Sequence, residues 1–486
     1  MAHISEDFIQ HISQQLPNHL SINDFLEACQ RPLRKSIRAN PLKMNAQELK
    51  ELFHNEGFSL EAIPWCEEAF WINEENKSLP DNLGNWLPHL QGCFYIQEAS
   101  SMLPVKALLD DLELTSTAKI LDMAAAPGSK TTQLAATLNN QGIIIANELS
   151  SSRLKGLHYN IQRCGITNTC LSHADGRVFG DSATGQFDAI LLDAPCGGEG
   201  TVRKDDSALT DWSLVKVNAI AELQKELIVS AYKALKPGGR LVYSTCTLSK
   251  EENQKVCQHL LDMFAGEVQV KPLDNLFQNA SEVATPEGYL HVFPQVFDCE
   301  GFFVACFEKT SKHEETSTPS SDRCKKAFTF SPISHKVFEQ LTQYCEQYGW
   351  DISSIKHNLW TKITTKSQEV WLLPIGTEQL SHNLKLNRYG LKLFDLLKHG
   401  IKIQHQAIVS FGQDFSRQTI ELTAEQSAIF YQGKDIYLDA KEKPPHNKEF
   451  IVTFGGVPLG FVKHLGNKLK NNLPRDLVRD GAFSKL

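Results

Sequence analysis

The sequence predicts an α/β fold built around a mostly parallel β-sheet, with smaller regions on both sides of this core. Between about residues 118 and 307, short β-rich runs alternate with segments of helix length, as in strands joined by crossover helices. A tight turn at Pro127 and Gly128 joins the first of these strands directly to a helix. A polar stretch at 311–325, rich in Ser and Thr, predicts an exposed linker before a C-terminal third with short strands.

The composition is that of a protein with several hydrophobic cores. A chain of 486 residues should form about three domains. With 41% hydrophobic and 22% charged residues, no run approaches the ~20 apolar residues that a membrane helix needs. The start, MAHISEDF, lacks the order of a secretory signal, so we expect a cytoplasmic protein with reduced thiols. Its 12 cysteines show no zinc-ligand spacing, so we expect no metal.

Two segments reverse the overall negative charge. The net charge of −8 argues weakly against a general polyanion binder, but association depends on local fields. Residues 31–43 and 463–479 are both basic and are candidate phosphate contacts. Their cations are Arg31, Arg34, Lys35, Arg38 and Lys43 in the first segment and Lys463, Lys468, Lys470, Arg475 and Arg479 in the second. A solvated face is the ordinary alternative for the second segment, but its glycines and asparagines favour a loop that follows a phosphate backbone.

The predicted strands of the core end in polar side chains. Ligands of open parallel sheets bind outside the carboxyl ends of the strands, so these side chains should line one crevice. They are Asp122, Glu148, Asp175, Asp193 and Cys246. Any one acid at such a position is more often a helix cap or a loop residue, but agreement among several strand ends favours a site. The runs at 288–294 and 301–309 should add an antiparallel hairpin to the sheet edge.

The turn after the first strand favours S-adenosylmethionine (SAM) over a dinucleotide. A dinucleotide site needs G-x-G-x-x-G to approach a pyrophosphate, and this loop has only Gly128. Helix-start amides can hold the single carboxylate of SAM. Glu148, roughly 20 residues further on, has the position of a ribose-binding acid, and Asp175 could face the adenine. Lys130 could steer the cofactor or the substrate, or lie solvated at the rim.

Two cysteines, Cys196 and Cys246, follow neighbouring predicted strands. A buried free cysteine is usually a small hydrophobe, but two thiols beside a SAM loop indicate covalent catalysis. Carbon 5 of cytosine is a poor nucleophile, so a thiolate must first attack carbon 6, and Asp193 could then act at ring nitrogen 3. These residues alone do not decide which thiol attacks.

Residues around the two thiols have predicted supporting roles. Gly197, Gly198 and Gly200 should leave the approach of a substrate ring unobstructed. Ser249, with Glu251 and Glu252, should open the helix that follows Cys246.

From about residue 31 to 309 the chain resembles the RNA cytosine-5 methyltransferases of the NOL1/NOP2/Sun family. The motifs, in the family's order, are RANPLK, YIQEASSMLP, LDMAAAPGSKT, DAPCGGEG, YSTCTLSKEEN and DCEGFFVA. The resemblance implies a Rossmann-like SAM-dependent methyltransferase core at 96–310 and an N-terminal α+β RNA-binding extension at 1–95. It implies that Cys246 is the nucleophile, that Cys196 aids product release and that Asp193 is catalytic. The implied SAM-binding positions are Ala124, Ala125, Ala126, Pro127, Gly128, Ser129, Lys130, Glu148, Asp175 and Asp193.

The segments RKDDSALTDWS and PLGFVKHLGNKLKNNLPRDLVRD extend the resemblance to bacterial members of the family. They imply a PUA-like RNA-binding domain at 387–486, after a middle α+β region at 326–386 to which we assign no role. The implied substrate is cytosine 1407 of 16S rRNA in the 30S subunit, and we expect a monomer. The same chemistry on tRNA, or a ribosome-assembly factor with a vestigial site, are the alternatives. An exocyclic-amine methylase would carry an Asp/Asn-Pro-Pro-aromatic tetrapeptide at Asp193–Cys196, so it is disfavoured.

Overall fold

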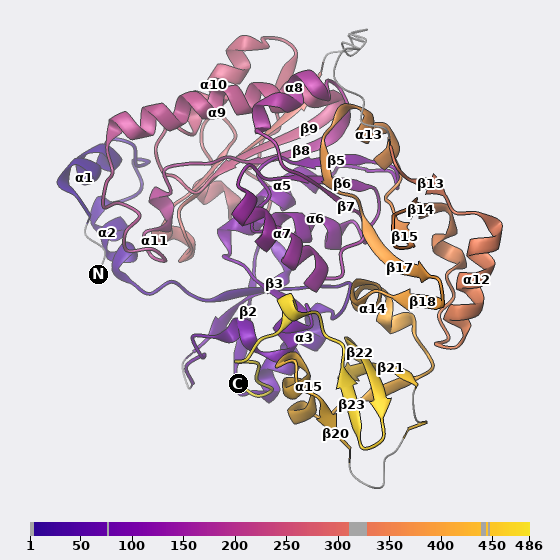
Figure 1. Cartoon of the computed structure of the whole chain (residues 1–486). Helices are drawn as coiled ribbons and strands as arrows, with labels where there is room; N and C mark the ends of the chain where they lie inside the picture. The colour runs from indigo at the N-terminus through magenta and orange to yellow at the C-terminus, as the bar shows by residue number, and fades with distance from the viewer. Residues whose placement is uncertain (1–3, 75–76, 311–327, 439–443, 446–447) are drawn as a thin grey trace.

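The computed structural model describes residues 4–74, 77–310, 328–438, 444–445 and 448–486. Within these ranges the strands form a small N-terminal sheet, a large central sheet and two further sheets in the C-terminal third. The N-terminal and last sheets lie on the same side of the central sheet (Figure 1). The linker predicted at 311–325 lies outside the described residues.

The central sheet confirms the predicted α/β fold. Its strand order is β10-β12-β9-β8-β5-β6-β7-β16, with β11 paired to β12. The inner strands are parallel and have these bounds: β5 (Lys119–Asp122), β6 (Ile143–Asn147), β7 (Thr169–Ser172), β8 (Phe187–Asp193) and β9 (Leu235–Thr245). Since the order reverses between β5 and β8, a crevice opens at the carboxyl ends of these strands.

The antiparallel edge is also confirmed, with one strand more than predicted. β12 (Phe302–Lys309) runs antiparallel to β9, and β11 (Leu290–Val292) pairs with it as the predicted hairpin. A further strand, β10 (Val268–Val270), pairs with the other end of β12.

Helices cover both faces of the central sheet. One hydrophobic cluster joins Ile120 to α5 (Leu103–Leu109), α6 (Ser129–Thr137) and α7 (Ser151–Arg163). A second joins the next residue, Leu121, to α8 (Phe179–Ser182), α9 (Leu214–Ala234) and α10 (Gln254–Met263). Because both faces are buried, strands such as β6 are continuous apolar runs rather than alternating ones.

The N-terminal region has two parts. The helices α1 (Glu6–Ser13) and α2 (Ile22–Gln30) pack through Phe8, Ile12 and Phe25 on Val202 and Leu248, which lie in loops of the central domain. The antiparallel sheet, in the order β2-β3-β1-β4, follows. Its elements are β1 (Ser36–Ala39), α3 (Ala46–Asn55), β2 (Ser59–Ile63), β3 (Cys66–Asn73), α4 (Leu87–Leu90) and β4 (Phe94–Ile96).

Two of the cations predicted to contact phosphate at 31–43 are buried instead. Arg38 donates to Gln97 Oε1 at 2.9 Å and to Thr132 Oγ1, on α6, at 3.0 Å. Lys43 donates to the Gln91 carbonyl at 2.8 Å, and burial lowers its pKa to about 8. These two side chains therefore fasten the N-terminal sheet to its neighbours. A charge run in the sequence does not reveal such internal acceptors.

The middle region forms a sheet that crosses the boundary predicted at residue 387. In the order β13-β14-β15-β17-β18, its strands are β13 (Ser331–Pro332), β14 (Leu359–Ile363), β15 (Gln368–Leu372), β17 (Leu391–Leu397) and β18 (Gly400–Ile403). The accompanying helices are α12 (His335–Glu346), α13 (Thr377–Asn383) and α14 (His405–Phe411). Between them, β16 (Leu386–Arg388) pairs antiparallel with β7. The middle region therefore extends the central sheet by one strand.

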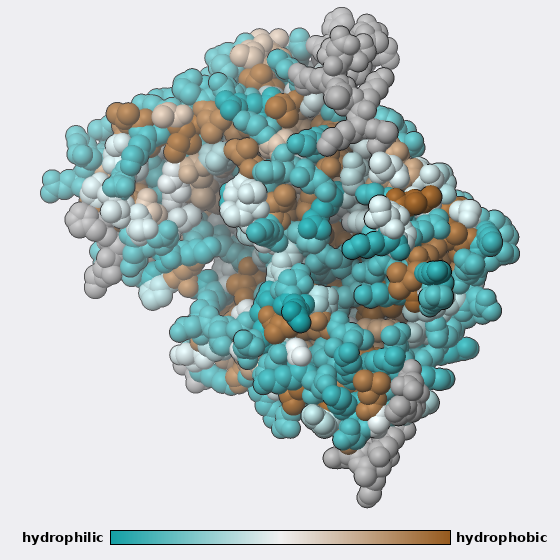
Figure 2. Space-filling model, in the orientation of Figure 1, coloured by the Kyte–Doolittle hydropathy of each residue, from teal (hydrophilic) through white to brown (hydrophobic). Residues whose placement is uncertain are grey.

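The last region is a curled sheet in the order β19-β21-β22-β23-β20, with α15 (Ala424–Tyr431). Its strands are β19 (Thr419–Glu421), β20 (Ile436–Tyr437), β21 (Glu449–Phe454), β22 (Val457–Leu465) and β23 (Lys468–Asn471). The basic segment 463–479 begins in a hairpin of β22 and β23 that turns at Gly466, whose φ is 67°. The expected extended loop is thus largely a hairpin. Figure 2 shows mostly hydrophilic residues over this region.

The C-terminus docks on the N-terminal domain through Trp86. This indole is 0% exposed, lies edge-on to Phe53 at 5.2 Å between ring centroids, and donates to the Ser484 carbonyl at 3.2 Å. The Leu87 amide donates to the Phe483 carbonyl at 2.9 Å. None of the helices in the described ranges has the length and apolar character needed to cross a membrane.

We predict that Trp86→Ala lowers the free energy of unfolding by about 3–5 kcal/mol, because it empties a fully buried aromatic site and frees the C-terminus. Trp86→Phe, which keeps a ring against Phe53, should lose less. Urea unfolding of the two variants and the wild type measures this, and a loss below about 1 kcal/mol for Trp86→Ala would contradict the docking role.

Candidate active site

A partly buried ion pair lies at the carboxyl end of β8. Asp193, the last residue of this strand, accepts a hydrogen bond from Lys130 Nζ at 2.8 Å through Oδ2. Its Oδ1 accepts from Ser244 Oγ, on the neighbouring strand β9, at 2.8 Å. Lys130 is only 7% exposed. Lys130 is therefore not solvated at the rim but lies inside the crevice, facing Asp193.

The two predicted thiols meet beside this pair. Cys196 Sγ and Cys246 Sγ lie 3.1 Å apart, near the starts of the loops that follow β8 and β9. Both are partly exposed, whereas every other cysteine in the described ranges is buried. The hydrogen bond to Cys246, together with burial, raises the pKa of the Cys196 thiol well above its ordinary value. Cys196 is therefore a neutral thiol near pH 7 and can donate its S–H toward Cys246.

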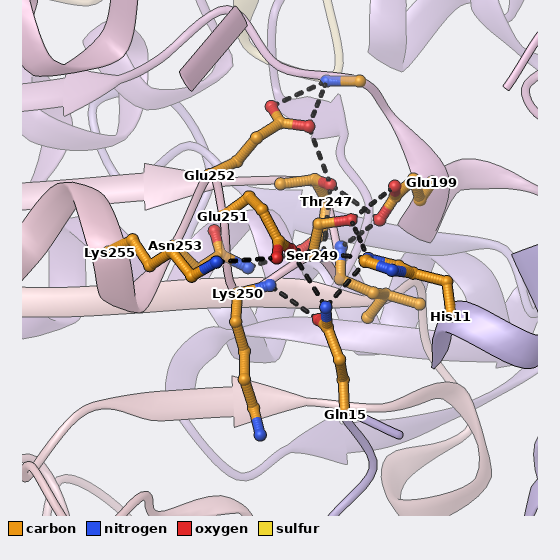
Figure 3. Close-up of polar contacts among 12 residues, drawn as sticks. His11, Gln15, Glu199, Thr247, Ser249, Lys250, Glu251, Glu252, Asn253 and Lys255 are labelled. Carbon is orange, nitrogen blue, oxygen red and sulfur yellow. Dashed lines mark hydrogen bonds and ion pairs between the residues drawn. The ribbon is translucent and has the colours of Figure 1, made fainter. Parts of the chain in front are cut away.

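Glu199, from the Cys196 loop, holds the loop that follows Cys246. Its fully buried carboxylate accepts hydrogen bonds from consecutive residues of that loop (Figure 3). The donors in that loop are Thr247 Oγ1 at 2.9 Å, the Leu248 amide at 3.0 Å and Ser249 Oγ at 2.6 Å. Trp212 Nε1, from the segment that leads from Glu199 to α9, donates to the same carboxylate at 2.5 Å. The backbone beside Cys246 is thus fixed by a single carboxylate.

Glu252 makes the reciprocal contact. From the Cys246 loop, its carboxylate accepts from the amide of Gly197, next to Cys196, at 3.0 Å and from Gln224 Nε2 at 2.8 Å. Burial raises the pKa of Glu252 to about 7. Each cysteine loop therefore contributes one buried carboxylate that binds the other loop.

The role predicted for Ser249, Glu251 and Glu252 in opening a helix is wrong. α10 begins only at Gln254, with Asn253 as its N-cap. Ser249 and Glu252 are used between the loops, as described above. Glu251 lies in an ion pair with Lys255 at 2.9 Å. Sequence position suggested capping because these residue types precede an apolar helix, but Ser249 and Glu252 bind groups of the Cys196 loop instead.

Helix α1 and Gln15, two residues beyond its end, also contact this loop, which the sequence did not indicate. Gln15 accepts from the Lys250 amide at 2.7 Å and donates to Glu251 Oε2 at 2.9 Å (Figure 3). His11 Nε2 lies 3.4 Å from Ser249 Oγ. The amphipathic pattern of α1 predicts a buried face, but it gives no signal of what that face covers.

The glycines after Cys196 serve internal packing rather than only substrate access. A Cβ on Gly200 would collide with the Gly301 carbonyl, and one on Gly197 would lie 2.8 Å from Glu252 Oε1. The Gly200 amide donates to the Cys246 carbonyl at 2.9 Å, and the Gly301 amide donates to the Gly200 carbonyl at 3.0 Å. Small residues are needed because three backbone segments meet here.

The predicted cofactor loop has free polar groups that suit an amino-acid ligand. Asp122 Oδ2 accepts from Thr131 Oγ1 at 2.6 Å, whereas Oδ1 is buried without a hydrogen-bond partner in the described ranges. Burial raises the pKa of Asp122 to about 7. The amides of Ser129, Lys130 and Thr131 lie in the first turn of α6, where helices leave donors unpaired. A carboxylate and an amino group could both be bound at this strand end.

The other predicted cofactor positions lie on the next two strands. Glu148 follows β6, is 4% exposed and accepts from the Ser150 amide at 2.8 Å. Asp175 lies beyond β7 and binds Arg177, at 2.7 Å from Oδ2, which holds the pKa of Asp175 below its usual range. The loop residues Ala124, Ala125 and Ala126 lie between β5 and α6. In the described ranges no group of three or more His, Cys, Asp or Glu side chains could hold a metal ion.

Comparison with known protein families covers nearly the whole chain. Residues 110–308 match the family model described as 16S rRNA methyltransferase RsmB/F. Three models described for 16S rRNA methyltransferase RsmF match as follows: its N-terminal domain at 4–99, its pre-PUA domain at 330–411 and its PUA domain at 417–479.

Individual proteins agree with these family matches. The ribosomal RNA small subunit methyltransferase F of Shewanella sp. (strain W3-18-1) is 47% identical, over 99% of this chain and 98% of that protein. The protein of the same name from Shewanella oneidensis is 48% identical over the same shares. Among solved structures, PH0851 is 30% identical with a TM-score of 0.56, covering 62% of this chain and 65% of that one.

We predict that Cys246→Ala moves the pH–rate profile for iodoacetamide alkylation of Cys196 to lower pH. The hydrogen bond to Cys246 is the first cause of the raised pKa, so its loss lets more thiolate form at a given pH. Mass spectrometry of the labelled peptide measures the rate. Cys345→Ala, far from the site, should change nothing, and an unmoved profile in Cys246→Ala would contradict the thiol contact.

We also predict that Glu199→Ala raises the hydrogen-exchange rate of the Leu248 amide at least about tenfold, because this amide loses its acceptor. Glu251→Ala is the matched control, since Glu251 binds the side chains of Gln15 and Lys255. Equal protection of Leu248 in both variants would show that Glu199 does not hold the loop.

Proposed function

The chain belongs to the family of ribosomal RNA small subunit methyltransferase F, and we propose that it forms 5-methylcytosine in 16S rRNA with SAM as methyl donor. The observation that carries this proposal is the pair of thiols, 3.1 Å apart, beside the Asp193–Lys130 pair. Methylation of an amine or hydroxyl needs no thiol, whereas carbon 5 of a pyrimidine requires prior attack at carbon 6.

The cofactor positions predicted from the sequence fit SAM. SAM, when bound, supplies an electrophilic methyl group on its sulfonium. We propose that the first-turn amides of α6 hold its carboxylate, that Glu148 accepts from the ribose hydroxyls and that Asp175 faces the adenine. We propose that the loop Ala124–Lys130 and Asp193 border the methyl-donating end of SAM. The orphaned Oδ1 of Asp122 supports a ligand with a donor at this point.

We assign the attack on carbon 6 to Cys246. Its Sγ forms a bond to carbon 6 as the carbon 5–carbon 6 π electrons move into the ring, and carbon 5 becomes nucleophilic. The developing charge is neutralised at ring nitrogen 3 by a proton that Lys130 Nζ passes to Asp193 along their 2.8 Å hydrogen bond and that Asp193 passes to the ring. Family resemblance selects Cys246 over Cys196 for this attack.

Cys196 then aids product release. After methylation a base removes the proton from carbon 5, those electrons re-form the carbon 5–carbon 6 double bond, and the bond from carbon 6 to Sγ of Cys246 breaks. The proton on ring nitrogen 3 returns through Asp193 to Lys130. The neutral thiol of Cys196, 3.1 Å from Cys246 Sγ, can donate a proton to the departing thiolate. The raised pKa of Cys196 suits a proton donor better than a nucleophile.

We propose cytosine 1407 of 16S rRNA in the 30S subunit as the target. A full-length match to proteins named for the small ribosomal subunit favours 16S rRNA over tRNA. Complete catalytic and cofactor positions argue against a vestigial site. We further propose that the protein acts in the cytoplasm as a monomer.

We predict that Cys246→Ala lowers SAM-dependent methylation of 30S subunits at least about a thousandfold, because the nucleophile is gone. Cys196→Ala should still attack but accumulate a covalent protein–RNA adduct. Asp193→Asn should lower kcat by about 10²–10⁴-fold. Tritium transfer from SAM, mapped to the modified base, with denaturing gels for the adduct, measures all three.

Cys345→Ala is the control for cysteine loss outside the site and should methylate at the wild-type rate. If Cys246→Ala still formed 5-methylcytosine while Cys196→Ala did not, the roles of the two thiols would be reversed. If the wild type modified neither 30S subunits nor naked 16S rRNA, the substrate proposal would be wrong.

A further inference from the structure

A large cavity lies where α7 meets the two C-terminal sheets. It has a volume of about 650 Å³, and its walls include Gln162 of α7, Lys402 of β18 and Phe461 of β22. A second hollow of about 600 Å³ shares His158, Gln162, Arg388 and Asp476 with it and continues to Ser151, the first residue of α7. We call the two together the α7 groove.

The α7 groove starts beside the cofactor site. Ser151 is three residues beyond Glu148, the proposed ribose-binding acid, and α7 spans 13 residues, or about 20 Å. Figure 1 shows α7 on the side of the central sheet that faces the C-terminal regions. A strand lying in the groove would therefore run from the proposed ribose-binding end of the cofactor site toward the last sheet.

The groove is cationic in a chain whose net charge is −8. Its cations are Lys155, Arg388, Lys392, Lys402 and Arg479. Its acids are Glu449 and Asp476. Lys392 is neutralised by Glu369 and Asp395, each at 2.7 Å. The other four cations form no ion pair within the part of the chain that the structure describes, so their charge is available to an anion.

The cavity also carries groups that can recognise a base. Trp371 and Phe461 offer aromatic surface, and Gln404 and Asn472 offer amide donors and acceptors. Burial lowers the pKa of His405 to about 4, so its imidazole is neutral and has one donor and one acceptor nitrogen. Its Nδ1 atom is buried without a hydrogen-bond partner among the described residues. Phosphate contacts beside an aromatic, amide-lined pocket are typical of sites for single-stranded RNA.

The groove is tied to the catalytic core. Arg388 is the last residue of β16, which pairs with β7 of the central sheet. Arg479 stacks over Tyr159 of α7, at 4.8 Å from the ring centroid. Arg479 was among the phosphate contacts predicted from the basic tail, whereas Arg388 and Lys402 lie outside the two basic segments singled out in the sequence.

We propose that the α7 groove binds a single-stranded segment of the substrate RNA outside the target base, with phosphates along Lys155, Arg388, Arg479 and Lys402 and one unstacked base in the cavity at His405. This inference rests on the proposed function for the identity of the RNA. It places one RNA contact at the junction of the catalytic, middle and last domains.

The test measures binding of in vitro transcribed 16S rRNA to the full-length protein by filter binding over a range of salt. Arg388→Gln and Lys402→Gln should each weaken binding about five- to tenfold and lower the slope of log K against log salt by about one. Affinity for SAM and kcat at saturating RNA should stay within about twofold of the wild type. Lys336→Gln, on the exposed face of α12, is the matched control.

Wild-type affinity and salt slope in both groove variants would overturn the proposal. Retained SAM binding shows that a variant is folded. If a variant lost SAM binding, a protein with a photo-reactive residue in place of Gln406 is tested instead of that variant. A crosslink to the RNA from position 406, and not from position 336, supports the groove. Absence of a crosslink from position 406 overturns the proposal. If the wild type methylates 16S rRNA but the groove variants bind RNA as the wild type does, only the groove proposal is rejected. If the groove variants weaken RNA binding but the wild type forms no 5-methylcytosine, only the proposed function is rejected.

Discussion

The active site depends on two buried carboxylates that bind each other's loops. Glu199, from the Cys196 loop, fixes residues 247–249, and Glu252, from the Cys246 loop, fixes the Gly197 amide. A buried carboxylate is costly unless hydrogen bonds satisfy it, and each donor left unpaired would cost about 1–3 kcal/mol. Because each carboxylate accepts several hydrogen bonds, these bonds offset the cost of removing it from water. The two loops are thereby held together with their thiols 3.1 Å apart.

This arrangement explains why the surrounding elements are where they are. β8 and β9 are neighbours in the sheet, so their carboxyl ends lie side by side, and α6 delivers Lys130 to Asp193. His11 of α1 and Gln15, just beyond this helix, contact the Cys246 loop. The N-terminal helices thereby support the catalytic loops, while buried Arg38 and Lys43 hold the N-terminal sheet in place. The RNA contacts we infer lie instead along α7 and the C-terminal regions.

The sequence was sufficient for the fold of the core and for the prediction that the two thiols lie near each other. Continuous apolar runs ending in Asp122, Glu148, Asp193 and Cys246 located the strands and the crevice, because burial on both faces and polar strand ends leave a local pattern. It was insufficient for Glu199, Glu252 and Gln15, whose partners lie in other loops, and for β16, which joins a sheet more than 200 residues earlier in the chain. Such long-range pairs leave no periodicity to detect.

The claim that the two carboxylates hold the thiols together is tested most directly by the effective concentration of Cys196 toward Cys246, measured from their disulfide equilibrium with oxidised and reduced glutathione. Our account predicts that Glu199→Ala and Glu252→Ala each lower this effective concentration at least about tenfold relative to the wild type, and that the double variant loses less than the sum of the two changes in free energy. An effective concentration that stays at the wild-type value in both single variants would show that the loops keep their positions without these carboxylates.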